Sequence, residues 1–175
     1  MKKIDLPVLE TERLILRPIS VDDLDAVFKW AGDSRVNKFL IYPLYKNSED
    51  GREWLSHLYE DEKKIDYGFV YKETGKLIGS GGIYYHEDTD TWNIGYNLAF
   101  DFWKKGLTVE AMEKIIEYVR NKFEVKVIEG EFCVDNYGSR RVMEKLGMSY
   151  YKDDEYKKLD GSETFKAKVF RKVFK

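Results

Sequence analysis

Two lysines and a glycine, Lys104, Lys105 and Gly106, stand directly before an apolar helical pattern that begins at Leu107. The first N–H groups of a helix have no partner inside the helix, and the helix dipole adds partial positive charge at this end. Adjacent lysines are therefore unfavourable here unless the segment is well solvated or binds an anion. Gly106 would let an anion approach the backbone closely. The segment alone indicates either a solvated loop or an anion site.

A second candidate segment carries Asn136 and Ser139, three residues apart, where a strand-like run meets another apolar helical pattern. Asn and Ser are frequent helix caps, so a structural role explains both residues, while a functional role stays open. Neither segment contains the Gly-x-x-x-x-Gly-Lys-Ser/Thr or the Gly-x-Gly-x-x-Gly pattern. A P-loop and a dinucleotide-binding fingerprint are therefore excluded.

Composition and charge limit the class of protein. The 175 residues suffice for one domain, which we expect to span residues 1–175. A net charge of −2 argues against a general nucleic-acid binder, whose phosphate contacts need a basic surface. Cys133 is the only cysteine and the histidines number two, so neither an internal disulfide nor a Cys/His metal site is expected. Without a signal-peptide pattern or an apolar run of roughly 20 residues, the sequence predicts a cytoplasmic protein, monomeric or homodimeric.

The surrounding patterns predict the elements that position both segments. Leu107, Ala111 and Ile115 recur at helical spacing and predict the clearest helix, while Ser20 and Asp23 form a capping-box pattern before another one. A strand meander followed by a strand–helix–strand unit favours an α+β fold with a mixed sheet. In order, we expect a strand at 13–18, a helix including 24–31, a helix from 47 or 48, strands at 65–71, 77–85 and 92–99, a helix from 107, a strand at 125–134, a helix around 142–146, and a hairpin of 150–159 with 163–174.

Together these segments resemble the GNAT N-acetyltransferase superfamily, most closely its branch of ribosomal-protein alanine N-acetyltransferases. The resemblance covers nearly the whole chain. It rests on four blocks in order: E-T-E-R-L-I-L-R-P-I-S-V-D-D, L-I-G-S-G-G-I, I-G-Y-N-L-A-F-D-F-W-K-K-G-L-T-V-E-A and D-N-Y-G-S-R-R-V-M-E-K-L-G-M. It implies a mixed, mostly antiparallel sheet of about seven strands with four helices, in which the fourth and fifth strands splay apart. It also implies acetyl-CoA as cosubstrate and no metal.

The resemblance further implies which residues bind acetyl-CoA. In this family the loop after the fourth strand binds the pyrophosphate through backbone amides, and its pattern Arg/Gln-x-x-Gly-x-Gly/Ala falls here on residues 103–108. Lys104 replaces a frequent glycine, and Thr108 replaces the final small residue. Asn136 is expected on the pantetheine arm and Ser139 near the thioester sulfur. The full expected set is Leu98, Ala99, Trp103, Lys104, Lys105, Gly106, Leu107, Thr108, Asn136 and Ser139.

Acetyl transfer needs a neutral amine, a polarised carbonyl and a stabilised thiolate. Deprotonation at pH 7 costs about 1.4 kcal/mol for an α-amine and about 4.6 kcal/mol for a lysine. A backbone N–H near Leu98 is expected to bind the thioester carbonyl, and Ser139 to donate to the thiolate. Glu131 shares one strand face with Glu129 and is the candidate base, although an exposed sheet carboxylate is the more common reason for such a residue. A nucleophilic Cys133 is disfavoured because neither histidine has a context that suggests its base.

The favoured function is therefore an acetyl-CoA-dependent N-acetyltransferase that acts by direct attack in a ternary complex. Its acceptor would be a protein N-terminus or a small-molecule amine, with no nucleic-acid or membrane partner. Two alternatives stay open. A non-catalytic acyl-CoA-binding or regulatory module is suggested by Asn93, which replaces a glutamate common in the family just before I-G-Y. A nucleotide-binding protein could use the same anion site before Leu107.

Overall fold

A mixed sheet of eight strands runs through the computed structural model, which describes residues 6–175. The strand order is β1-β2-β3-β4-β5-β6-β8-β7, and every neighbouring pair is antiparallel except β5 with β6. The predicted α+β class is confirmed, with eight strands in place of about seven. The strands are β1 (Leu9–Glu10), β2 (Leu14–Arg17), β3 (Lys64–Tyr71), β4 (Lys76–His86), β5 (Thr91–Leu98), β6 (Val127–Cys133), β7 (Ser149–Lys157) and β8 (Thr164–Val173).

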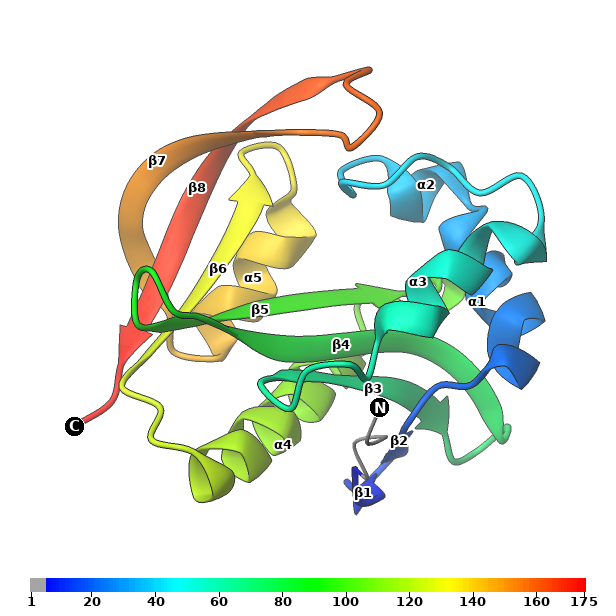
Figure 1. Cartoon of the computed structure of the whole chain (residues 1–175), viewed down its shortest axis with the longest axis horizontal. Helices are drawn as coiled ribbons and strands as arrows, with labels where there is room; N and C mark the ends of the chain where they lie inside the picture. Colours follow the sequence, from blue (N-terminus) through cyan, green and yellow to red (C-terminus); the bar gives the residue numbers. More distant parts are fainter. Residues whose placement is uncertain (1–5) are drawn as a thin grey trace.

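Helices cover both faces of the sheet (Figure 1). The α-helices in the described part of the chain number five rather than the predicted four: α1 (Leu24–Ala31), α2 (Ser34–Asn37), α3 (Arg52–His57), α4 (Leu107–Lys122) and α5 (Tyr137–Lys145). Three 3-10 turns, Val21–Asp23, Ser48–Gly51 and Phe100–Phe102, lead into neighbouring elements. The prediction missed α2 and β1 because each is too short to show a period in the sequence.

The core consists of two apolar clusters, one on each face. On the face covered by α4 and α5, which we call the α4 face, the central cluster includes Tyr67, Phe69, Ile83, Met112 and Ile115. On the opposite side, the α1 face, the cluster includes Val27, Trp30, Leu58, Val70 and Leu77. Side chains along each strand therefore alternate between the two faces, and a residue's face follows from its register.

Local sequence signals explain several element boundaries. Ser20 and Asp23 form the predicted capping box at the turn that precedes α1. Gly147 follows the end of α5 with a φ of 79°, as a C′ glycine does. The helix expected from 47 or 48 begins instead as a 3-10 turn capped by Asn47, and its α-helical part starts at Arg52.

Strands β5 and β6 are the splayed pair that corresponds to the fourth and fifth strands of the prediction. Their parallel pairing involves only Trp92 with Ile128 and Asn93 with Glu129, at the beginning of each strand. Beyond that point the two strands diverge, and β6, β8 and β7 cross the view at a steep angle to β3–β5 (Figure 1). The divergence opens the sheet in its middle.

The hairpin of β7 and β8 reaches across to the segment that follows α2. Tyr156 Oη donates to the Phe39 carbonyl at 2.6 Å, and Leu159 N donates to the Ile41 carbonyl at 2.7 Å. Lys158 Nζ, on a side chain that is only 9% exposed, donates to the carbonyls of Asn37 and Leu40. These bonds join the two halves of the sheet on the α1 face, beyond the divergence of β5 and β6.

Candidate active site

A cleft with a volume of about 2370 Å³ passes through the divergence of β5 and β6 and opens on both faces of the sheet. Its walls include the start of α4, the start of α5, the segment after α2 and the strands β3 to β6. Typical small-molecule pockets measure about 300–1,000 Å³, so this cleft has room for a long cofactor and a second substrate together.

The start of α4 forms one end of the cleft on the α4 face. Gly106 is the residue before the helix and has a φ of 75°, in the left-handed region that favours glycine. Lys104 shares this unusual conformation with a φ of 61°. The resulting tight turn aims the unpaired N–H groups of Leu107 and Thr108 at the cleft, where both residues are among its walls. This arrangement suits an anion such as a diphosphate.

Glu110 fastens this helix start to the beginning of the sheet. Its carboxylate accepts hydrogen bonds from Thr11 Oγ1 at 2.6 Å, from Arg13 N at 2.8 Å and from Arg13 Nε at 2.7 Å. Burial acts to raise the pKa of Glu110, but the bonds from Thr11 and Arg13 outweigh burial and hold this pKa below its usual value. Arg13 Nη1 also donates to the Lys105 carbonyl at 2.8 Å, so Arg13 holds the loop before α4 as well as the helix itself.

The end of β5 directs backbone donors into the opening. Ala99 N donates to the Ile78 carbonyl at 2.7 Å, and the register pairs Leu98 with Gly79. Because hydrogen bonding alternates along an antiparallel pair, the N–H of Leu98 points away from β4 and toward the space between β5 and β6. Trp103 Nε1 donates to the Leu98 carbonyl at 2.7 Å and holds this strand end against the loop.

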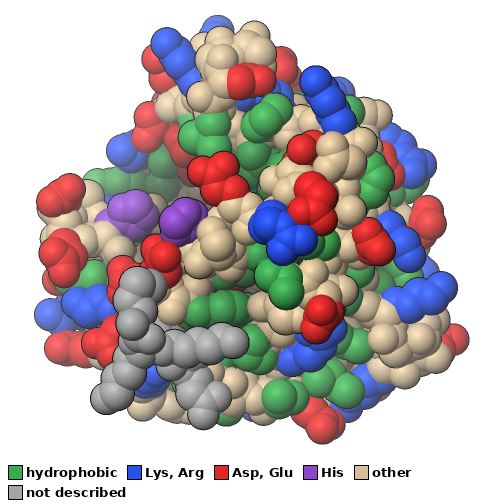
Figure 2. All heavy atoms as spheres, turned by 45° about the vertical axis from the view of Figure 1, so that its right-hand side comes forward, with side chains coloured by type: hydrophobic (Ala, Val, Ile, Leu, Met, Phe, Trp, Pro, Cys, Tyr) green, Lys and Arg blue, Asp and Glu red, His purple; other side chains and the backbone are tan. Residues whose placement is uncertain are grey.

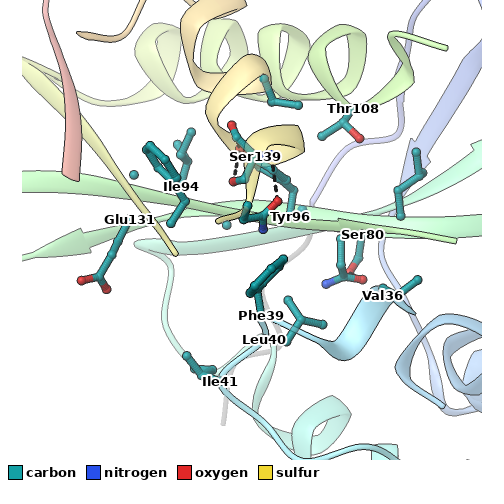
Figure 3. Close-up of a pocket in the computed structure, with 18 of the residues that line it drawn as sticks. Val36, Phe39, Leu40, Ile41, Ser80, Ile94, Tyr96, Thr108, Glu131 and Ser139 are labelled. Carbon is teal, nitrogen blue, oxygen red and sulfur yellow. Dashed lines mark hydrogen bonds between the residues drawn. The ribbon is translucent and has the colours of Figure 1, made fainter. Parts of the chain in front are cut away.

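Three side chains meet where α5 begins. Asn136 Oδ1 accepts from Ser139 N at 3.1 Å, so Asn136 caps α5 while its amide NH₂ stays available. Ser139 Oγ lies 2.9 Å from Tyr96 Oη, which also donates to the Ser139 carbonyl at 3.0 Å. Figure 3 shows these bonds beside the cleft. Burial raises the pKa of Tyr96 above its usual value, so the hydroxyl stays protonated and can donate.

Glu131 lies on the other face of the sheet. Figure 3 shows its carboxylate on the opposite side of the β5 ribbon from Ser139, the side on which Phe39 and Ile41 lie. Glu129 shares that face but is bound by Arg171, so of the two only Glu131 is free of an ion pair among the described residues. Glu131 is exposed on the cleft wall, and partial burial, reinforced by Asp154, raises the pKa of its carboxyl.

A polar cluster on the α1 face contains Asp66, which sequence reasoning missed. Asp66, Tyr84 and Tyr42 line the cleft from β3, β4 and the segment after α2. Burial raises the pKa of Asp66 to about 6, an effect that Lys64 only partly offsets. Burial likewise raises the pKa values of both tyrosines, so their hydroxyls stay neutral. Asp66 and Tyr84 sit inside apolar strand patterns, and no local motif marks them.

The structure brings most of the predicted site residues to the cleft. The predicted residues on its walls are Leu98, Trp103, Lys104, Gly106, Leu107, Thr108, Glu131, Asn136 and Ser139. Ala99 and Lys105 lie off these walls; the N–H of Ala99 is bound to β4, and Lys105 Nζ lies 5.2 Å from the centre of the Phe102 ring. The cleft therefore has backbone N–H groups at the start of α4, a backbone donor at the end of β5, and the side-chain NH₂ of Asn136 at the start of α5. This arrangement fits an extended molecule that carries a diphosphate, such as acetyl-CoA.

The molecular surface has mixed charge on the face that Figure 2 shows, where lysine and arginine side chains alternate with acidic ones rather than forming a patch. Within residues 6–175 no helix is long and apolar enough to cross a membrane. The same residues contain no group of three or more His, Cys, Asp or Glu placed to hold a metal ion.

Comparison with known proteins places this chain in one class, the acetyltransferases. The acetyltransferase (GNAT) domain model matches residues 13–149, and the chain belongs to this family. The predicted superfamily is thus confirmed, and membership makes the chain an N-acetyltransferase with acetyl-CoA as cosubstrate.

Individual relatives agree with this assignment. The chain is 29% identical over 148 residues to the uncharacterized N-acetyltransferase YoaA of Bacillus subtilis. The aligned region covers 81% of this chain and 82% of YoaA. The microcin C7 self-immunity acetyltransferase MccE, solved with acetyl-CoA and AMP, matches with a TM-score of 0.81 at 20% identity over 94% of each chain. A candidate ribosomal-protein-serine acetyltransferase from Vibrio cholerae matches with a TM-score of 0.80 at 16% identity, covering 95% of this chain and 97% of that one. These two structural likenesses show a shared fold.

Proposed function

We propose that this protein transfers the acetyl group of acetyl-CoA to a primary amine by direct attack in a ternary complex. One observation carries the proposal: the divergence of β5 and β6 joins a donor half on the α4 face to an acceptor half on the α1 face. The donor half consists of the start of α4, the end of β5 and the start of α5. The acceptor half consists of the α1-face side chains of β3, β4 and β6 with the segment after α2.

The donor half supplies the groups that the transfer requires. The N–H groups at the start of α4 would hold the diphosphate, and the Asn136 amide would bind the pantetheine arm. The Leu98 N–H points into the divergence and would polarise the thioester carbonyl, a contribution on the order of 3 kcal/mol when such a donor is well placed. The amine nitrogen then bonds to the carbonyl carbon as the C–S bond breaks.

The leaving thiolate and the amine proton need partners on opposite sides of the sheet. The hydrogen-bonded pair of Ser139 and Tyr96 lies on the donor side and would stabilise the thiolate. Glu131 lies on the acceptor side, and its raised pKa suits a group that takes the amine proton through water. Cys133 is 3% exposed and has no hydrogen bond to a histidine among the described residues, which supports direct attack over an acetyl-cysteine route.

Turnover is the direct test. Purified protein mixed with acetyl-CoA should release free thiol with at least one member of a panel of small aliphatic amines and peptides with free N-termini. A ribosomal-protein peptide belongs in the panel because one similar structure is that of a candidate ribosomal-protein-serine acetyltransferase. Tight CoA binding without release on any acceptor would favour the alternative, a non-catalytic acyl-CoA-binding module, which Asn93 suggests because it replaces a glutamate common in the family. ATP displacing CoA would favour a nucleotide-binding protein.

A further inference from the structure

Asp66 is a buried carboxylate that faces the cleft without a protein partner. It is 7% exposed, it lines the cleft on the α1 face, and no hydrogen bond or ion pair among residues 6–175 uses its carboxylate. The phenol oxygen of Tyr84 likewise takes part in no hydrogen bond within this part of the chain. Burying a charge is costly unless it is paired, so two neighbouring acceptors directed at one space indicate a ligand that brings donors.

Two glycines explain why both side chains lie flat on the sheet. The register places Asp66 beside Gly82 and Gly82 beside Gly95, in one row across β3, β4 and β5. A Cβ on Gly82 would lie 2.5 Å from Asp66 Oδ1, and a Cβ on Gly95 would collide with the Tyr84 hydroxyl. Asp66 therefore leans over β4, and Tyr84 leans over β5 toward the divergence.

Strand spacing decides which role Asp66 can play. Neighbouring strands lie about 4.8 Å apart, so a carboxylate above β4 is on the order of 7 Å from the space between β5 and β6. A group that takes a proton directly must lie within about 3 Å of the amine. Asp66 is thus too far from an amine that attacks in the divergence, but it is well placed for a second group of the same acceptor.

The surroundings of Asp66 favour a cation. The titratable groups that face it are Lys64 on β3, Tyr84 on β4, Tyr42 in the segment after α2, and Tyr59 after α3. Lys64 forms no ion pair with Asp66, and the three tyrosines are neutral, so Asp66 carries the negative charge of this site. Phenol oxygens and ring faces both attract ammonium groups.

We propose that Asp66, with the Tyr84 hydroxyl, binds a second positively charged group of the acceptor, which makes linear diamines and longer polyamines the preferred acceptor class. The inference rests on the proposed acetyltransferase function for the attacking amine, but the cation site itself does not depend on turnover. A chain of five or six single bonds spans about 6–7 Å when extended, which matches the separation between Asp66 and the divergence.

The test compares putrescine with butylamine, which has the same carbon chain and lacks the second amine. Wild-type protein should acetylate putrescine with a kcat/KM at least tenfold above that for butylamine, because a charge-assisted hydrogen bond contributes tenfold or more. Asp66→Asn should raise the KM for putrescine about tenfold or more and leave the constants for butylamine and acetyl-CoA unchanged. Asp66→Glu, which keeps the charge, should retain most of the preference, and Tyr84→Phe should lose less than Asp66→Asn.

Asp88→Asn is the matched control, because it removes one carboxylate from the turn after β4, outside the cleft. It should behave like the wild type. Equal turnover of both amines by the wild type would overturn the proposal, as would an unchanged putrescine preference in Asp66→Asn. A fall in kcat for both amines alike would overturn it in favour of a proton-transfer role.

Binding separates this inference from the proposed function. Equilibrium dialysis of putrescine against the protein with CoA bound should show binding that Asp66→Asn weakens about tenfold or more. That result without turnover would support the cation site and count against the acetyltransferase proposal for this acceptor. Absence of putrescine binding by the wild type would overturn the cation site, whatever other amine is acetylated.

Discussion

The donor half of the cleft presents mainly backbone groups to its ligand, whereas the acceptor half presents side chains. The donor half uses backbone groups and two contiguous segments: the turn at Gly106 leading into α4, and the start of α5 with Asn136 and Ser139. The acceptor half uses single side chains that come from separate strands, such as Asp66 and Glu131. A shared donor molecule can be held by backbone geometry that tolerates many sequences, whereas recognition of a particular acceptor requires particular side chains. The two halves should therefore respond differently to mutation.

The largest effect should come from the backbone of the donor half. Gly106→Val forces a β-branched residue into a φ of 75° and so should distort the turn that aims the N–H groups at the start of α4, and affinity for CoA should fall by about 100-fold or more. Isothermal titration with CoA measures this loss. Gly75→Val is the matched control, because Gly75 has a similar φ of 65° in the turn before β4, and a Cβ added there would meet nothing within 4 Å beyond its chain neighbours. It should lose similar stability and keep its CoA affinity. Unchanged affinity in Gly106→Val would remove the anion site from this turn.

In the acceptor half, Asp66 should make the free energy of unfolding depend on pH. Burial raises the pKa of Asp66 from 3.8 to about 6, so the folded state holds this proton more tightly than the unfolded state does. The free energy of unfolding therefore falls as the pH rises from about 4 to 6, and above that range ionised Asp66 destabilises the protein by up to about 3 kcal/mol. Asp66→Asn should be more stable than wild type at pH 8, with the difference shrinking toward pH 4.

Urea unfolding at several pH values measures this difference. A difference between Asp66→Asn and wild type that stays constant with pH would mean that the carboxyl of Asp66 has an ordinary pKa and is not an unpaired charge. In that case Asp66 would no longer be evidence that the acceptor half, unlike the donor half, binds its ligand through particular side chains.

An intermediate effect should follow from the one donor-half side chain placed near the leaving group. Ser139→Ala removes the hydroxyl that pairs with Tyr96 and should lower kcat by about tenfold to 100-fold, because hydrogen bonds to charged groups contribute about 1.5–3 kcal/mol. CoA affinity should change little. Steady-state kinetics measure both quantities, and Ser162→Ala, in the turn between β7 and β8, serves as the control. No change in kcat would exclude Ser139 from stabilising the leaving thiolate.

The smallest effect should come from the lysines in the loop before α4. Lys104→Ala keeps the same backbone strain at a φ of 61° and removes only an exposed charge, so CoA should bind about two- to fivefold more weakly. The difference should shrink further in high salt because exposed charges are screened. Titrations at low and high salt measure it. A loss as large as that of Gly106→Val would show that side-chain charge, rather than backbone geometry, holds the diphosphate.

Local sequence signals located much of the fold, and the family resemblance indicated the residues proposed for the donor half. The helix after Gly106, the capping box of Ser20, and the final hairpin were predictable because each depends on residues close together in the chain. Short elements such as α2 and β1 were not, because two to four residues cannot display a period. The order β6-β8-β7 and the bonds from Lys158 to the segment after α2 also depend on contacts between distant parts of the chain.

By itself, the sequence determined the family of this protein and indicated the proposed site for its acetyl donor, because that site consists of backbone groups fixed by turns and caps that neighbouring residues encode. Only the tertiary structure decided the acceptor half. Asp66, Gly82 and Gly95 become one row of the sheet through strand register, and Tyr84 leans over β5 because Gly95 leaves space for it. Pairing between strands sets such neighbours, and no local pattern records which strands will pair or in what register.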